Sequence, residues 1–201
     1  MNGRTFVLLG QKIIMRKLIF QEFISLDGYA ADKDHSTKFF EDPPYSEDSD
    51  EDLLTEMHRF DTILLGATTY KMFVGFWPHV SNEEQIVADK LNSIPKIVFS
   101  KTLKEAPWGK WPAAKVVRDD AVSAVKDLKA QNGRDMVLWG SISLAQNLVK
   151  ANLIDEYQLR IVPVLLGEGT LLFTSHGKLD LELTKSKAYP SGLLLTHYRP
   201  K

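Results

Sequence analysis

The sequence predicts a three-layer α/β/α fold, in which helices cover both faces of a mixed, mostly parallel sheet of about eight strands. Over the first 150 residues, short apolar strand-like segments alternate with amphipathic segments of helical period. This alternation is typical of parallel strands joined by covering helices. The last two strand-like segments flank Pro190-Ser191-Gly192, which predicts an antiparallel hairpin at one edge. A length of 201 residues with 44 % hydrophobic residues suits one domain with a single core.

The elements follow from short apolar runs and their bounding residues. The run at 17–25 is the first strand, and the polar, turn-rich stretch at 32–49 is a loop. The first long helix starts after a weak capping box at Ser49 and Asp52, and Leu53, Leu54, Met57 and Phe60 share one of its faces. Further strands are expected at 62–66, 96–100, 114–118, 135–140, 154–167, 179–189 and 193–199, and further helices at 67–74, between 82 and 95, at 120–131 and at 141–150.

Composition excludes several classes of protein. The net charge of −1 and the lack of a dense basic run argue against nucleic acid as a partner. Without cysteine, disulfides, thiolate catalysis and iron–sulfur clusters are excluded, and a cytoplasmic location is expected. No apolar run reaches the roughly 18–20 residues that cross a bilayer. Residues 1–14 are expected to form an N-terminal extension, and 15–201 the single domain.

The first strand ends in an unusual stretch, "ISLDGYAADKDH" at 24–35. A hydroxyl, a carboxylate and a glycine follow the apolar run as Ser25, Asp27 and Gly28. These residues form either an ordinary turn, in which Asp27 bonds local backbone N–H groups, or the polar lip of a pocket. In the second case Asp27 is a candidate acid.

Three strand-to-helix junctions place small or hydroxyl residues where a helix begins. Each could simply cap its helix. However, ligands of open α/β sheets bind beyond the carboxyl ends of the strands, and helix N-termini favour phosphate. Together the junctions could therefore hold a nucleotide. They are Gly66-Ala67-Thr68-Thr69, Ser100-Lys101-Thr102 and Gly140-Ser141-Ile142-Ser143.

Two other patterns are weaker. In "LLGEGTLLF" at 165–173, two glycines bracket Glu168 after a strand, which a turn with positive φ explains without a dinucleotide fingerprint. The five histidines have no metal-ligand spacing, and no metal is expected.

Taken in chain order, the motifs resemble the dihydrofolate-reductase-like superfamily over residues 15–199. The nearest branch is the reductase domain at the C-terminus of the bifunctional riboflavin-biosynthesis deaminase/reductase, which also has stand-alone bacterial members. The motifs with this resemblance are "FISLDGYAA", "ILLGATTYKMF", "IVFSKTL" and "LWGSISLAQNLVKANLIDEYQLRIVPVLLGEGTLLF".

The resemblance implies NADPH as the cofactor and assigns a role to each motif. The turns near the cofactor's phosphates are matched by Gly66, Thr68 and Thr69, and by Gly140, Ser141, Ile142 and Ser143 at the pyrophosphate. The turn near the adenosine ribose and its 2′-phosphate is matched by Ser100 and Lys101. The loop beside the nicotinamide is matched by Gly167, Glu168, Gly169 and Thr170. Ser25 and Asp27 match the place where nicotinamide and substrate meet, and the proton donor of folate reductases falls near Asp50. Two positions depart from the pattern: Ala67 replaces a usual Arg, and Trp139 replaces a glycine.

The implied reaction is hydride transfer to an imine-like carbon of a small molecule, most like that of 5-amino-6-(5-phosphoribosylamino)uracil reductase in riboflavin biosynthesis. Such a step requires a proton on nitrogen, with Asp27 as the first candidate donor and Asp50 as the second. Lys33, Lys38 and Arg160 are candidates for a substrate phosphate. The alternatives are a dihydrofolate or pterin reductase and a non-catalytic nucleotide-binding module. A homodimer is expected from the resemblance.

Overall fold

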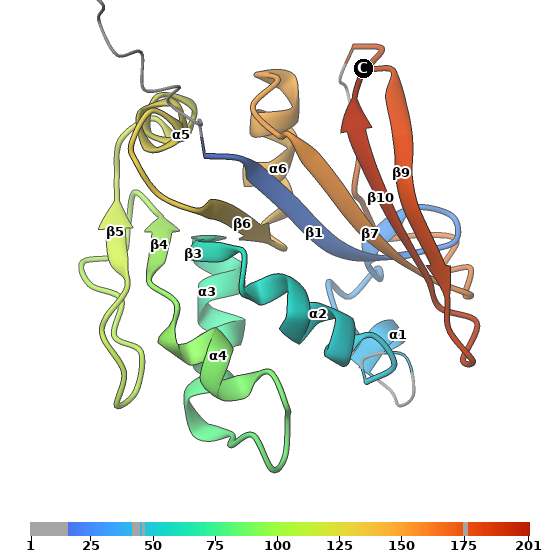
Figure 1. Cartoon of the computed structure of the whole chain (residues 1–201), viewed down its shortest axis with the longest axis horizontal. Coiled ribbons are helices and arrows are strands. Elements are labelled where there is room, and N and C mark those ends of the chain that lie inside the picture. The colour runs from blue at the N-terminus through green and yellow to red at the C-terminus, as the bar shows by residue number, and fades with distance from the viewer. Residues whose placement is uncertain (1–15, 42–44, 46, 175–176) are drawn as a thin grey trace, which may run out of the picture.

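The structure is a computed structural model that describes residues 16–41, 45, 47–174 and 177–201. The expected extension at 1–14 lies outside these residues. Eight of the described strands form one sheet in the order β5-β4-β3-β6-β1-β7-β10-β9 (Figure 1). They are β1 (Leu18–Ser25), β3 (Phe60–Gly66), β4 (Lys96–Phe99), β5 (Lys115–Val117), β6 (Asp135–Trp139), β7 (Glu156–Val162), β9 (Leu181–Ala188) and β10 (Leu194–Pro200).

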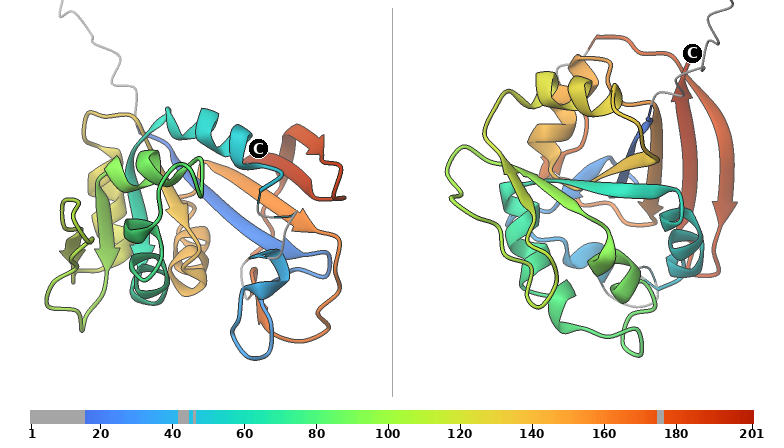
Figure 2. Two further views of the ribbon diagram at one scale, coloured as in Figure 1. Left: turned by 90° about the horizontal axis from the view of Figure 1, so that it is seen from below. Right: turned by 60° about the vertical axis from the view of Figure 1, so that its left-hand side comes forward.

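The sheet is parallel from β5 to β7, and the C-terminal hairpin adds β10 and β9 in antiparallel orientation. Helices α2 (Asp50–Met57) and α4 (Ala88–Ser93) cover one face, and α5 (Ala121–Lys129) and α6 (Ile142–Lys150) cover the other (Figure 2). This layered arrangement confirms the predicted fold class. The remaining short elements are α1 (Lys38–Glu41), α3 (Ala67–Val74) and the 3-10 helix η1 (Trp77–His79).

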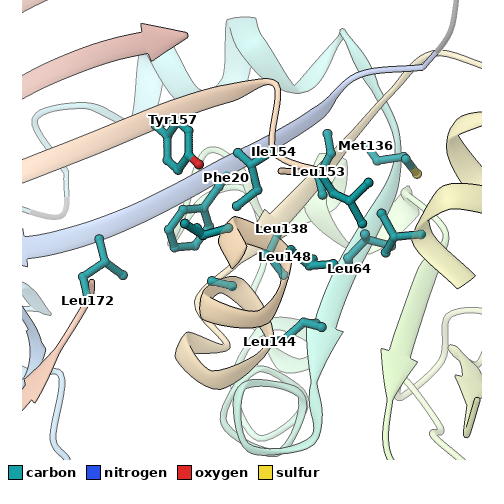
Figure 3. Packing of buried hydrophobic residues seen from close by; sticks show 14 of the residues in the cluster. Phe20, Leu64, Met136, Leu138, Leu144, Leu148, Leu153, Ile154, Tyr157 and Leu172 are labelled. Atoms are coloured by element: carbon teal, nitrogen blue, oxygen red, sulfur yellow. The ribbon is translucent and has the colours of Figure 1, made fainter. Parts of the chain in front are cut away.

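Each face of the sheet has its own apolar core. On the α6 face, Phe20 of β1 packs with Leu138 of β6 and with Leu148 of α6, and all three are fully buried (Figure 3). On the α2 face, Met57 packs with Ile63 and Leu91. The alternation of side chains along each strand divides its residues between these two cores.

The centre of the sheet contains a step that prepares the site. Strand β6 pairs with β1 only as far as Trp139 opposite Gln21, whereas β7 pairs with β1 up to Val162 opposite Ser25. The chain also changes direction here, because β6 lies on one side of β1 and the following strand, β7, lies on the other. This is a topological switch point, where open α/β sheets bind ligands.

The structure differs from the expected elements in four places. The stretch expected to be a loop at 32–49 contains the short helix α1. The long strand expected at 154–167 ends at Val162, directly before Pro163, because proline cannot donate to a strand ladder. Phe60 begins β3 instead of ending a helix. A small second sheet, which the sequence did not predict, pairs β2 (Tyr29–Ala31) with β8 (Thr170–Leu171).

Candidate active site

A cavity of about 1850 Å³ opens at the switch point. This is larger than the roughly 300–1,000 Å³ that suits a drug-sized ligand, so it has room for a dinucleotide and a second molecule. All three strand-to-helix junctions line it, together with residues 21–23 in the middle of β1 and the start of α2. The predicted residues that line it are Asp50, Gly66, Thr68, Thr69, Ser100, Lys101, Gly140, Ser141, Ile142, Ser143 and Thr170.

Two of these junctions lock together. The N–H of Gly66 donates to Ser141 Oγ at 2.6 Å, and the N–H of Ser141 donates to Thr69 Oγ1 at 2.9 Å. Gly140 and Ser141 both have left-handed backbone, with φ of 55° and 61°. A Cβ atom on Gly140 would lie 3.0 Å from Thr69 Oγ1, so only glycine leaves this turn undisturbed.

The hydrogen bonds between these two turns determine which hydroxyl and backbone N–H groups remain available to a ligand. Thr69 is buried and its hydroxyl already accepts from Ser141, so Thr69 holds the turn, whereas Thr68 is exposed. Helices α3 and α6 begin here without a side-chain cap from Gly66 or Ser141. Their first backbone N–H groups and partial positive charge therefore meet the cavity, as an anion requires.

The third junction adds positive charge. Ser100 is buried and its Oγ accepts from the N–H of Leu103 at 3.1 Å, which leaves the exposed Lys101 as the charged group of this turn. Arg118 lines the cavity as well, and its guanidinium is steadied by the carbonyl of Leu103 at 2.6 Å. Sequence reasoning missed Arg118, although it follows the carboxyl end of a strand as the predicted junctions do.

Asp27 and Ser25 do not line the cavity. The Asp27 carboxylate accepts from Ser25 Oγ at 2.6 Å, from the N–H of Leu166 at 3.1 Å and from the N–H of Gly167 at 2.8 Å. The Ser25 bond contributes most to lowering the pKa of Asp27, and the two N–H groups lower it further. The expected acid of raised pKa is therefore not found at Asp27, which ties two loops together as in the turn interpretation.

The glycine loop at 167–170 is the other half of this contact. Gly167, Glu168 and Gly169 are outside the cavity lining, and Glu168 forms an ion pair with Lys33 at 3.5 Å. A Cβ atom on Gly169 would lie 2.1 Å from the Ala31 carbonyl oxygen. Close packing of β8 against β2 thus requires that glycine, and Thr170 alone of this expected set reaches the cavity.

Six aromatic side chains line the cavity: Phe23, Phe40, Phe73, Phe76, Trp77 and Trp139. Phe73 and Trp139 contact each other, with ring centroids 6.1 Å apart, and Trp139 directly precedes Gly140. The rings of Phe23 and Phe40 stack with centroids 4.4 Å apart and belong to a separate apolar cluster, and this pair is called the aromatic end. Flat aromatic walls of this kind suit a planar heterocycle.

A carboxyl and a guanidinium border the aromatic end. Burial raises the pKa of Asp50 to about 6, although the nearby Arg160 opposes the shift. Arg160 is buried, lies over the Phe23 ring and donates from Nε to Ser49 Oγ at 2.8 Å. Its Nη2 has no hydrogen-bond partner among the residues described. Ser49 therefore serves Arg160, and the capping box expected for α2 does not form.

Glu22 is a carboxyl that sequence reasoning missed. It lines the cavity from β1, and burial raises its pKa to about 8, while the Phe23 N–H opposes the shift. A signal was available, because Glu22 is the one charged residue in the apolar strand "LIFQEFIS". A charge in a strand buried on both faces needs an explanation.

The ring of Trp139 is held in the wall of the cavity. Its Nε1 donates to Gln21 Oε1, and Gln21 Nε2 donates to Gln158 Oε1 at 2.5 Å and to Glu56 Oε2 at 3.1 Å. This buried network fixes the indole in the wall, beside the interlocked turns at Gly66 and Gly140, which are called the cradle.

The molecule gives no sign of metal or membrane sites in its described part. Among residues 16–41, 45, 47–174 and 177–201, no group of three or more His, Cys, Asp or Glu side chains could hold a metal ion. In the same ranges, no helix is long and apolar enough to cross a bilayer.

The order and directions of the strands define the class of fold. A mostly parallel sheet of this order with an antiparallel C-terminal hairpin is a dihydrofolate-reductase-like fold. Dihydrofolate reductase from Enterococcus faecalis superposes with a TM-score of 0.58 at 13 % identity, covering 92 % of this chain and 96 % of that chain.

The family is narrower than the fold class. The model of the RibD C-terminal domain matches residues 16–195, and the chain therefore belongs to this family. Among curated proteins, YyaP of Bacillus subtilis (strain 168), which is uncharacterized, is 28 % identical over 188 residues, 91 % of this chain and 94 % of that protein.

Two solved structures that resemble the chain carry names from riboflavin biosynthesis. A protein from Shewanella sp. PV-4, whose name assigns it to riboflavin biosynthesis, matches with 29 % identity and a TM-score of 0.75, over 92 % of this chain and 99 % of that chain. The deaminase/5-amino-6-(5-phosphoribosylamino)uracil reductase of Thermotoga maritima matches at 13 % identity with a TM-score of 0.64, over 93 % of this chain and 57 % of that chain. This second match supports the fold alone.

Proposed function

We propose that this protein is an NADPH-dependent reductase that transfers hydride to an imine-like carbon of a pyrimidine- or pterin-type substrate. The first candidate reaction is that of 5-amino-6-(5-phosphoribosylamino)uracil reductase. The observation that supports it most is the juxtaposition of two features in one cavity. The same cavity is lined by a cradle of two interlocked glycine turns and by aromatic side chains, together with the buried Arg160 and the carboxyl of Asp50.

The cradle suits a pyrophosphate. Gly66 and Gly140 leave the backbone open, since a Cβ atom on either would press on Ser141 or Thr69. Backbone N–H groups at the starts of α3 and α6 would bind the phosphate oxygens, as helix N-termini do in other nucleotide sites. Thr68, Ile142 and Ser143 border the same groups.

Two cations would select NADPH over NADH. Lys101 and Arg118 both line the third junction, where the resemblance places the adenosine ribose. They replace the arginine that folate reductases have at the position of Ala67. A guanidinium steadied by backbone carbonyls suits a 2′-phosphate, because its planar N–H groups remain oriented.

When bound, the reduced nicotinamide supplies the hydride, and the chain supplies position, dryness and a proton. Aromatic side chains would hold the substrate ring, and Asp50 with Arg160 would bind its polar edge. The free Nη2 of Arg160 suits a carbonyl oxygen of such a ring. Ser25 and Asp27 would act indirectly, by fixing the loop that ends at Thr170.

A pterin or dihydrofolate substrate is the second candidate, and one observation favours it. The substrate phosphate of the first candidate needs a cation, yet neither Lys33 nor Lys38 lines the cavity. Lys33 is paired with Glu168 at 3.5 Å, and Arg160 is buried between Ser49 and Phe23. A neutral fused ring would fill the aromatic end without requiring such a cation.

Two measurements test the proposal. A fluorescence titration measures the binding of NADPH, and an absorbance assay then follows the oxidation of NADPH over minutes in the presence of each substrate. We expect NADPH to bind and to be oxidised with either the aminouracil ribosyl phosphate or dihydrofolate. Binding without oxidation across both substrates would favour the non-catalytic module. No binding would defeat the cofactor assignment and the reductase with it.

Three accompanying predictions remain untested. The cytoplasmic location, the homodimer and the absence of a nucleic-acid partner rest on composition and resemblance. Gel filtration with light scattering would measure the oligomeric state directly.

A further inference from the structure

We propose that Glu22 donates the proton to the substrate nitrogen as hydride reaches the neighbouring carbon. This inference deepens the proposed function and rests on it. It assigns the acid to β1, inside the cavity, instead of to the loop at Asp27 or to the start of α2 at Asp50.

The position of Glu22 follows from the step in the sheet. Strand β6 pairs with β1 no further than Gln21, so Glu22 is the first residue of β1 past the end of β6. On the other side, Glu22 pairs with Leu159 of β7, an apolar residue. Glu22 therefore borders the gap in which the cavity opens, and the glycine turns and the aromatic side chains line the same cavity.

The carboxyl group has one occupied oxygen and one free oxygen. Oε1 accepts from the N–H of Phe23 at 3.0 Å, which fixes the group at the edge of the gap. Oε2 is buried and has no hydrogen-bond partner in the described part of the chain. A buried polar atom without a partner is rare in native proteins and often marks a functional group.

The other titratable groups around the cavity are placed less well for this task. Asp27 is held by three hydrogen bonds outside the lining, and Asp120 caps α5 through the N–H of Ser123 at 2.8 Å. Burial raises the pKa of Asp50 as well, but Arg160 opposes the shift and keeps this pKa at about 6. The charged or titratable residues that share the lining with Glu22 are His35, Glu41, Asp50, Lys101, Arg118, Asp119, Asp120, Lys150 and Arg160.

The electrostatics agree with the geometry. Burial raises the pKa of Glu22 to about 8, against a smaller lowering by the Phe23 N–H. At neutral pH the group is therefore a carboxylic acid, with a proton available on the free oxygen. An acid whose pKa lies near the working pH combines the correct protonation state with a useful tendency to release the proton.

Reduction of the C=N bond requires one hydride and one proton. The C=N carbon receives a hydride, which is a proton with an electron pair, and the nitrogen receives the proton from Glu22 Oε2. The product is a CH–NH single bond, and the nicotinamide is oxidised. Glu22 is left as a carboxylate and regains its proton from water after the product leaves.

A simpler role for Glu22 is structural, as an acceptor for the Phe23 N–H. The variant Glu22→Gln separates the two roles, because its amide oxygen can still accept that N–H while its NH₂ group cannot release a proton. Asp50→Asn is the matched test of the rival acid, and Glu51→Gln, an exposed carboxylate beside it, controls for loss of charge on α2.

The first experiment needs no ligand. Infrared spectroscopy of the full-length protein across pH should show the carbonyl band of a protonated carboxylic acid that titrates near pH 8. The band should be missing in Glu22→Gln and present in Glu51→Gln. A wild-type spectrum without this band at neutral pH would overturn the inference whatever the assays give.

The second experiment measures kcat/KM against pH, with NADPH and whichever of the aminouracil ribosyl phosphate or dihydrofolate is reduced. The wild type should lose rate above about pH 8, tenfold per pH unit, since a single group must be protonated. The fall of kcat/KM above about pH 8 is called the alkaline limb. We expect Glu22→Gln to lower kcat/KM about 100-fold and to abolish this limb, whereas Asp50→Asn should keep the limb.

The outcomes separate the inference from the proposed function. If turnover occurs and Glu22→Gln keeps the limb, another acid is responsible and the inference fails while the reductase stands. If the infrared band is present but no substrate is reduced, the proposed function fails, and Glu22 loses its assigned role.

Discussion

Two regions of the molecule are rich in polar groups, and they differ in how those groups are satisfied. In the loop contact formed by 25–31 and 165–170, every carboxylate oxygen of Asp27 has a partner, and the pKa of this group is lowered. In the cavity wall, Glu22 Oε2 and Arg160 Nη2 have none within the described ranges. Asp27 therefore holds two loops together through its hydrogen bonds, whereas Glu22 has a carboxyl oxygen that can still bond a ligand.

Glycines provide the strongest test of this difference. Gly140→Ala should weaken NADPH binding by roughly 10- to 100-fold, because its Cβ must displace Thr69, 3.0 Å away, and distort the cradle. Gly28→Ala is the matched control. It has the same left-handed requirement, with φ of 88°, but nothing within 4 Å. Titration of both variants should show a loss of affinity only for Gly140→Ala, and equal losses would contradict the cradle.

Removal of the cations at the third junction should have the next largest effect. We expect Lys101→Ala combined with Arg118→Ala to raise the Kd for NADPH about tenfold, since two charge-assisted contacts to a phosphate are lost. The Kd for NADH should change little, because NADH lacks the 2′-phosphate. A parallel loss for both cofactors would place the 2′-phosphate elsewhere.

Glu22 should also affect how the free energy of unfolding depends on pH. Because the folded state raises the pKa of Glu22 from 4.5 to about 8, the native protein binds this proton more tightly than the unfolded chain. Wild-type stability should therefore fall between these pH values. Glu22→Gln lacks this loss. Between pH 5 and pH 8 we expect its stability to gain on the order of 3–4 kcal/mol relative to the wild type, roughly 10 °C in Tm. A pH-independent difference in thermal melts would argue against the buried acid.

The loop contact should respond in the smallest and most selective way. Asp27→Asn should lower Tm and leave kcat within about threefold of wild type, since Asp27 holds a loop and does not touch the cavity. Because the pKa of Asp27 is lower in the folded protein than in the unfolded chain, its contribution to stability is present above pH 3.8 and is lost as pH falls through the folded pKa. A large loss of kcat with an unchanged Tm would return Asp27 to the reaction.

Much of the fold could be predicted because it depends on local pattern. Apolar period and bounding residues located nearly all strands, and Pro190-Ser191-Gly192 located the hairpin. The small sheet of β2 and β8 could not be found this way, since its pairing joins Tyr29 to Leu171, far apart in the chain. Its one local trace, Gly169, indicates a turn equally well.

The site divides along the same line. The glycine junctions were recognisable because backbone geometry limits which residues can stand there. The roles of Asp27 and Glu22 depend instead on what meets each carboxyl in three dimensions. Asp27 accepts from the nearby Ser25 and from two distant backbone N–H groups, of Leu166 and Gly167. Glu22 instead borders the cavity, because β6 ends one residue earlier along β1. Residue type alone pointed to Asp27, whereas the geometry on which our proposal rests points to Glu22.

The central claim is that the acid of this site is in the strand and not in the loop. The most direct test is the pH profile of kcat/KM for Glu22→Gln beside that for Asp27→Asn. The account predicts that the fall above about pH 8 disappears in Glu22→Gln and persists in Asp27→Asn. The reverse pattern would contradict it.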